Sequence, residues 1–129
     1  LLGRPFALTG RVVPGDGRGR TIGFPTANLE AEVELIPQSG VYASRLVLLG
    51  EDPVHRLDAV TNIGVRPTFD GTNMSIETHV LDSDVDLYGQ RVDVELVKRI
   101  RPERKFASVD ELVAQIAQDI LQAREALAA

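Results

Sequence analysis

The sequence predicts a mainly β protein, a small antiparallel barrel covered by one C-terminal helix, and three observations support this. Five or six segments alternate apolar and polar residues with the period of two that is typical of a half-buried strand. Turn-forming residues over hairpin lengths separate most of these segments. After Phe106 the apolar period changes to about 3.6 residues, which indicates an amphipathic helix. The expected strands are Phe6–Val13, Leu29–Leu35, Val41–Leu49, Leu57–Val65, Met74–Leu81 and a segment from Val92 toward Ile100.

The composition fits one soluble domain and excludes several classes of function. The 129 residues, 43% hydrophobic and 26% charged, are enough to bury a core. The absence of Cys excludes a disulfide framework and a thiolate metal site, and it fits the cytoplasm, where we expect the protein. A net charge of −5 argues against a nucleic-acid surface, and no apolar run is long enough to cross a membrane. The chain begins without Met, so we expect a piece of a longer protein.

The first expected strand ends at Pro14, and a glycine- and arginine-rich loop, Gly15–Arg20, follows it. The loop is not a P-loop, because the only lysines of the chain are Lys98 and Lys105. It also lacks the third glycine of the dinucleotide fingerprint. Any phosphate site here therefore has another design.

Thr26 comes directly after Pro25, which restricts the backbone, and Asn28 lies two residues further on. In an extended segment the two side chains point the same way. A hydroxyl and an amide oxygen on one face are hard neutral donors that suit a phosphate-bound Mg²⁺. Taken alone, the segment is more typical of a surface turn.

The middle of the chain contains one strand with clearly separated faces. Met74–Leu81 places apolar residues on one side and Ser75, Glu77 and His79 on the other. We expect a long turn-rich loop, Arg66–Asn73, before this strand. The acidic loop that follows it lacks the glycine and the final glutamate of a calcium-binding EF-hand loop.

Ser108 and Glu111 form a capping-box pair that predicts the start of the helix. One apolar stripe then runs along it. The stripe consists of Leu112, Ile116, Ile120, Ala123 and Leu127.

Conventional catalytic groups are absent, since the two histidines have no ligand-spaced partners and no serine nucleophile motif occurs. The remaining polar groups suit phosphoryl transfer, which requires positioning, a metal on the phosphates and a carboxylate that accepts the proton of the attacking hydroxyl. Glu77 is the candidate carboxylate, although an exposed strand Glu is more often simply solvated. Arg101 and Arg104 are candidates for the same site, although such residues are more often surface charges beside a helix.

In their order along the chain, several blocks together resemble the riboflavin kinase (flavokinase) family. The resemblance spans nearly the whole sequence and is specific because the blocks are collinear. These blocks are Gly10–Val13, Gly15–Arg20, Gly23–Asn28, Gly40–Ala43, Asn62–Phe69, Ile76–His79, Asp86–Gly89 and Arg101–Phe106.

The resemblance implies a six-stranded antiparallel Greek-key β-barrel with a C-terminal α-helix. The implied activity is ATP-dependent phosphorylation of the riboflavin 5′-hydroxyl, which gives FMN and ADP. The chain is most similar to the C-terminal kinase module of bifunctional bacterial riboflavin kinase/FMN adenylyltransferases (FAD synthetases). Residues 1–129 would then form one kinase domain, preceded in the natural chain by an FMN adenylyltransferase domain.

The resemblance also assigns roles to residues. Glu77 would be the catalytic base, and Thr26 and Asn28 would hold Mg²⁺ with ATP. The implied nucleotide-binding residues are Gly15, Arg18, Gly19, Arg20, Gly23, Pro25, Thr26, Asn28, Leu87 and Tyr88. The implied flavin-binding residues are Asn73, Ser75, Glu77, Arg101 and Arg104.

Two other classes remain open at the level of sequence. One is a barrel that binds a flavin or a nucleotide without turnover. The other is an interaction module that binds protein through an exposed strand edge.

Overall fold

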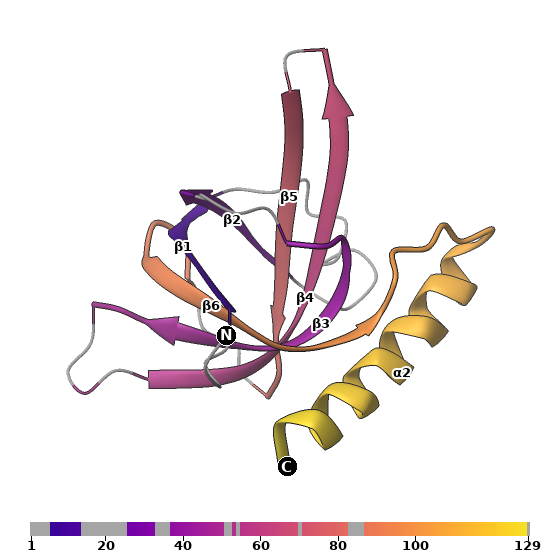
Figure 1. Ribbon diagram of the computed structural model, residues 1–129. Coiled ribbons are helices and arrows are strands. Elements are labelled where there is room, and N and C mark those ends of the chain that lie inside the picture. Colours follow the sequence, from indigo (N-terminus) through magenta and orange to yellow (C-terminus); the bar gives the residue numbers. More distant parts are fainter. Residues whose placement is uncertain are drawn as a thin grey trace.

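The computed structural model describes residues 6–13, 26–32, 37–50, 53, 55–69, 71–82 and 87–128. Six strands and a long C-terminal helix make up the regular structure of these residues (Figure 1). Their bounds are β1 Phe6–Val13, β2 Ala27–Glu32, β3 Gly40–Leu48, β4 His55–Thr68, β5 Gly71–Val80, β6 Arg91–Arg101 and α2 Val109–Ala128.

The six strands form a closed antiparallel barrel in the spatial order β1-β2-β5-β4-β3-β6. Strands β3, β4 and β5 are neighbours in sequence and in space, whereas β2 lies beside β5 and β6 lies beside β3. A run of consecutive strands with a fourth strand returning beside it is the Greek-key arrangement. The expected fold, a six-stranded barrel with one terminal helix, is confirmed.

The expected turn-rich loop Arg66–Asn73 was wrong, because most of it belongs to a β-hairpin. Strand β4 continues to Thr68 and β5 begins at Gly71, so that Pro67 pairs with Thr72 across the hairpin. This hairpin projects beyond the other strands in Figure 1. Gly and Pro there indicated a break, but their effect is confined to the tip, and cross-strand pairing overrides local turn propensity elsewhere. Strand β2 begins two residues earlier than expected, at Ala27.

The barrel interior is apolar, and it also contains a short line of buried hydroxyls. Leu8, Ile63 and Val92 are among its fully buried side chains. The Thr61 hydroxyl lies 2.7 Å from that of Ser44 and 2.9 Å from that of Thr78. The three hydroxyls therefore satisfy one another inside the barrel.

Helix α2 lies on the outer surface of the barrel against β3, β4 and β6. Its first turn has the expected cap, because the Glu111 amide donates to Ser108 Oγ at 3.2 Å and Glu111 Oε2 accepts from the Ala107 amide at 3.2 Å. The C-terminal half packs Ala123 and Leu127 against a second apolar cluster on the barrel. Within the described part of the chain, no helix has the length and apolar character needed to span a membrane.

Candidate active site

A row of cross-strand partners on the outer face of the barrel is the basis of the site. Asn28 on β2 is directly opposite Glu77 on β5, and Glu77 is directly opposite Asn62 on β4. The row continues through Val41 on β3 to Arg101 on β6. Directly opposed residues share a face of the sheet. Strand pairing therefore brings together side chains that are far apart in the sequence.

Thr26 and Asn28 lie on this outer face, as the alternation predicted. Ala27 and Leu29, which alternate with them, pack against the interior cluster. Thr26 lines the same pocket as Glu77, and Asn28 is the cross-strand partner of Glu77. The structure therefore brings together the two predicted metal-holding residues and the predicted base.

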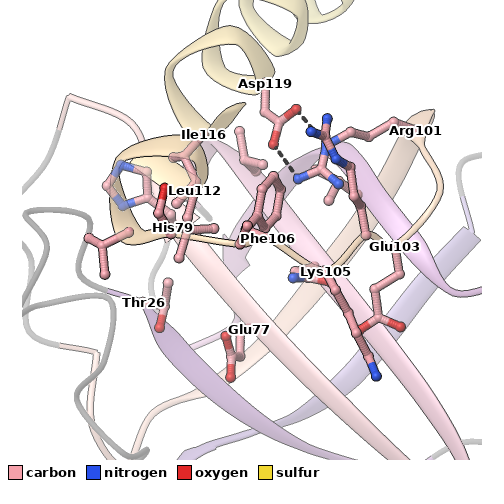
Figure 2. Close-up of a pocket in the computed structure, with 17 residues that line it drawn as sticks. Thr26, Glu77, His79, Arg101, Glu103, Lys105, Phe106, Leu112, Ile116 and Asp119 are labelled. Atoms are coloured by element: carbon pink, nitrogen blue, oxygen red, sulfur yellow. Dashed lines mark hydrogen bonds and ion pairs between the residues drawn. The ribbon is translucent and has the colours of Figure 1, made fainter. Parts of the chain in front are cut away.

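The pocket lies between this outer face and helix α2, and its volume is about 660 Å³. Such a volume is within the range of small-molecule sites, roughly 300–1,000 Å³. Figure 2 shows Thr26 and Glu77 on the strand side, with Leu112 and Ile116 of the helix across from them. One side of the pocket is therefore polar, and the opposite side is largely apolar.

The segment between β6 and α2 forms the third wall. Arg101, Glu103, Arg104 and Lys105 line it together with Phe106. The guanidinium carbon of Arg104 lies 4.9 Å from the centroid of the Phe106 ring, and that of Arg101 lies 5.7 Å from it. Both distances are within cation–π range. Arg101 and Arg104, predicted to lie toward a flavin, thus lie on the wall of the pocket.

Asn73 and Ser75 lie on β5 but are not among the pocket-lining residues. Ser75 is opposite Gly64. A Cβ at Gly64 would lie only 2.7 Å from Ser75 Oγ and 3.1 Å from Glu103 Oε1. Glycine at this position therefore leaves room for the Glu103 side chain beside the row of strand partners.

Leu87 and Tyr88, both predicted to bind the nucleotide, differ in their exposure. Leu87 is buried in the barrel core, whereas Tyr88 is 65% exposed. The segment is fastened to the end of β1, because the Gly89 amide donates to the Val12 carbonyl at 2.9 Å. Of this pair, only Tyr88 has an exposed side chain. The remaining predicted nucleotide residues, Gly15, Arg18, Gly19, Arg20, Gly23 and Pro25, lie outside the described residues.

Several pocket residues were missed at the level of sequence. Alternation placed His79 on the same strand face as Glu77, but neither His79 nor Asn62 was predicted to belong to the site. Leu112 and Ile116 were assigned to the apolar packing stripe, but they line the pocket. Asp119 interrupts that stripe with a charge, and this was the available signal for its role.

The donor set is of a kind that a nucleotide-bound metal requires. No group of three or more His, Asp or Glu side chains suited to a metal occurs among the described residues. Thr26 and Asn28 offer neutral oxygens beside one carboxylate, Glu77. Mg²⁺ is commonly held by one or two protein oxygens together with substrate phosphates. The residues therefore fit a metal that arrives with ATP.

Comparison with known proteins agrees with this geometry. The model of the family described as "Flavokinase: Riboflavin kinase" matches residues 2–127. The bifunctional riboflavin kinase/FMN adenylyltransferase of Escherichia coli K12 is 55% identical over 125 residues, which are 97% of this chain and 39% of that protein. The chain thus spans about two fifths of the length of this curated relative.

Two solved structures share the fold. A riboflavin kinase from Trypanosoma brucei matches with a TM-score of 0.69 at 27% identity, over 96% of this chain and 78% of that one. A structure described as a macrolide-efflux protein from Streptococcus pneumoniae matches with a TM-score of 0.86 at 39% identity, over 96% of this chain and 40% of that one.

Fold, pocket and relatives together define a small-molecule kinase domain. The chain belongs to the riboflavin kinase family. The expected family, riboflavin kinase, is confirmed, and the non-catalytic binding barrel is not favoured.

Proposed function

We propose that this chain binds riboflavin in the pocket between the barrel and helix α2 and phosphorylates its 5′-hydroxyl there. The new bond joins the ribityl oxygen to the γ-phosphorus of ATP, and the bond from that phosphorus to the β–γ bridging oxygen breaks. FMN and ADP leave as products. The observation that carries this proposal is the row that sets Glu77 between Asn28 and Asn62, with Thr26 in the same pocket.

Glu77 is the general base in this proposal. A carboxylate is ionised at neutral pH and accepts a hydrogen bond from an alcohol, so it can orient the hydroxyl and take its proton as the phosphorus–oxygen bond forms. Its place on a rigid strand supports this role, because phosphoryl transfer depends mainly on positioning.

Thr26 and Asn28 would hold Mg²⁺ with the ATP phosphates. When bound, the ion would neutralise charge on the phosphate oxygens. The nucleotide would extend from Asn28 past the end of β1, where Val13 pairs with Asn28. The exposed Tyr88 lies at the same end of β1, because its neighbour Gly89 is hydrogen-bonded to Val12. The glycine loop and its arginines would cover the phosphates, as the family resemblance implies.

The flavin would occupy the helix side of the pocket. Leu112, Ile116 and Phe106 give an apolar surface of the kind that a flat aromatic ring system requires. Arg101 and Arg104 border that surface, and Asn73 and Ser75 would contact the ligand from strand β5.

The longer natural chain would carry an N-terminal FMN adenylyltransferase domain, because the curated relatives are named as bifunctional and the chain covers 39% of them. FMN formed in this domain would then be the substrate of the second activity. A cytoplasmic location fits the requirement for ATP. Neither nucleic acid nor membrane is a proposed partner, in keeping with the net charge of −5.

The test is a direct assay of the purified chain. Riboflavin, ATP and MgCl₂ are added, and the flavins are separated by chromatography. We expect FMN and ADP in equal amounts, with no FMN when either ATP or Mg²⁺ is omitted. Riboflavin binding without any FMN would instead support a non-catalytic barrel, and the kinase proposal would fail.

A further inference from the structure

Asp119 on helix α2 is buried beside the pocket and carries a charge. It is 2% exposed, and among the described residues it is the one Asp, Glu, Lys, Arg or His side chain in the buried class. Its Oδ1 accepts hydrogen bonds from Arg101 Nε at 2.8 Å and from Gln115 Nε2 at 3.0 Å. Its Oδ2 accepts from Arg101 Nη2 at 2.8 Å (Figure 2). The carboxylate is therefore fully engaged by two side chains.

These contacts also determine what Arg101 can do. Two of its nitrogens form a fork on Asp119, and Nη1 donates to the Pro102 carbonyl at 3.1 Å. A guanidinium recognises an anion best through such a paired edge. Because that edge is occupied by Asp119, Arg101 links the end of β6 to the helix and contributes to the pocket mainly through its position.

The same network extends to the rest of the wall. Gln115 uses its amide nitrogen on Asp119 and its oxygen on Arg104, which donates from Nη1 at 3.0 Å. Arg101 and Arg104 both lie against the ring of Phe106. The aromatic wall of the pocket is therefore held by two cations, and each cation is bound to the helix through Asp119 or Gln115.

Packing of the helix alone does not explain this charge. Ile116 and Ala123 flank Asp119 on the apolar stripe at spacings that share one helix face, so an apolar residue would continue the stripe. A buried ion pair is often no more stabilising than well-packed apolar residues. The helix already packs on the barrel through Ala123 and Leu127. We therefore assign the Asp119 carboxylate to holding the pocket wall rather than to docking the helix.

A second ion pair on the same helix provides a matched control. Arg124 donates to both carboxylate oxygens of Asp82, at 2.7 and 2.9 Å. Its hydrogen bonds lower the pKa of the Asp82 carboxyl. This pair is solvent-exposed, and neither residue lines the pocket. It fastens the helix to the barrel without touching the wall that contains Phe106.

We propose that Asp119 is a positioning residue for riboflavin, because it fixes Arg101 and, through Gln115, Arg104, and so holds Phe106 in place as the aromatic wall of the pocket. The inference rests on the proposed function, since it assigns the flavin to this side of the pocket. In this proposal Asp119 acts on the flavin side of the pocket, whereas Thr26 and Asn28 act on the nucleotide side.

The test compares Asp119→Asn with Asp82→Asn in the purified chain. Riboflavin affinity is measured by flavin fluorescence titration with Mg²⁺ and ADP present, and the KM for ATP is measured in the FMN assay. Asp119→Asn removes a charge-assisted pair, so we expect the riboflavin Kd to rise about tenfold or more while the KM for ATP changes less than about twofold. Asp82→Asn should leave both within about twofold. Equal effects of the two variants, or a parallel rise for ATP, would overturn the proposal.

A double-mutant cycle tests whether Asp119 acts through the wall. Phe106→Leu alone should raise the riboflavin Kd, and adding Asp119→Asn should weaken binding little further, because one wall is already lost. Independent, additive effects would contradict the proposal. If Asp119→Asn fails to fold, Gln115→Leu cuts the link to Arg104 without leaving Arg101 unpaired, and an unchanged riboflavin Kd in that variant would overturn it.

The titration also keeps this inference distinct from the proposed function. If the wild-type chain binds riboflavin but makes no FMN, the kinase proposal fails, and the riboflavin Kd of Asp119→Asn still tests the positioning role of Asp119. A wild-type chain that does not bind riboflavin contradicts both.

Discussion

Glu77 and Thr78 are neighbours on strand β5, yet they belong to opposite sides of the barrel wall. Thr78 is 1% exposed inside the barrel, where its hydroxyl pairs with Thr61. Glu77 lies on the outer face between Asn28 and Asn62 and lines the pocket. Two polar residues at consecutive positions thus have different surroundings, and strand alternation separates a buried structural group from the proposed base.

The chemistry of each side follows from its surroundings. Inside the barrel, neutral hydroxyls can satisfy one another, and every buried side-chain nitrogen or oxygen of the described residues has a hydrogen-bond partner. A carboxylate would be costly there unless it were paired. On the outer face, the row is open to the pocket and can receive a ligand. A change on the outer face should therefore alter activity, and a change inside the barrel should alter stability.

The largest effect is expected for Glu77→Gln, which keeps the shape of the side chain and removes the base. We expect kcat for FMN formation to fall by roughly 10²-fold or more, since this is the usual contribution of a general base. Steady-state assays at saturating riboflavin and ATP measure this. The free energy of unfolding, measured by urea denaturation, should stay within about 0.5 kcal/mol of wild type. Retained activity would remove Glu77 from this role.

The inner side is tested by Thr61→Val, which leaves the hydroxyls of Ser44 and Thr78 without their shared partner. We expect the free energy of unfolding to fall by about 1–3 kcal/mol, the cost of unsatisfied buried polar groups. Urea unfolding measures the change, and kcat at low temperature should be close to wild type. A loss of activity without a loss of stability would break the contrast between the two sides.

A triple variant provides the control for this prediction. Ser44→Ala, Thr61→Val and Thr78→Val together remove every hydroxyl of the line and leave no orphaned partner. This variant should be less destabilised than the sum of its single changes, because replacing all partners with apolar groups can be nearly neutral.

A smaller effect is expected for Thr26→Ala and Asn28→Ala, each of which removes one neutral oxygen donor. We expect the KM for ATP to rise by about three- to tenfold, which corresponds to one net hydrogen bond or less, while riboflavin affinity changes little. The dependence of rate on MgCl₂ should shift in the same direction. An effect on riboflavin alone would contradict the assignment of these residues to the nucleotide.

Much of this site was readable in the sequence. The alternation in Met74–Leu81 placed Glu77 on the outer face, and proline-restricted backbone placed Thr26 and Asn28 on one side. The cap at Ser108 was also correct, because capping depends on residues three apart in the chain. These features are local, so the sequence by itself determines them.

Partners across strands and between strand and helix were decided by the tertiary structure. The sequence marks Asn62 as a polar strand residue, but the register alone makes it the neighbour of Glu77. In the sequence, Asp119 is only a charged residue in an apolar stripe, and the fold makes Arg101 its hydrogen-bond partner. Cross-strand pairing also extended the β4–β5 hairpin through the expected loop. Local patterns determine which face a side chain occupies, whereas closure of the barrel and docking of the helix determine what it meets, because those contacts join residues distant in the chain.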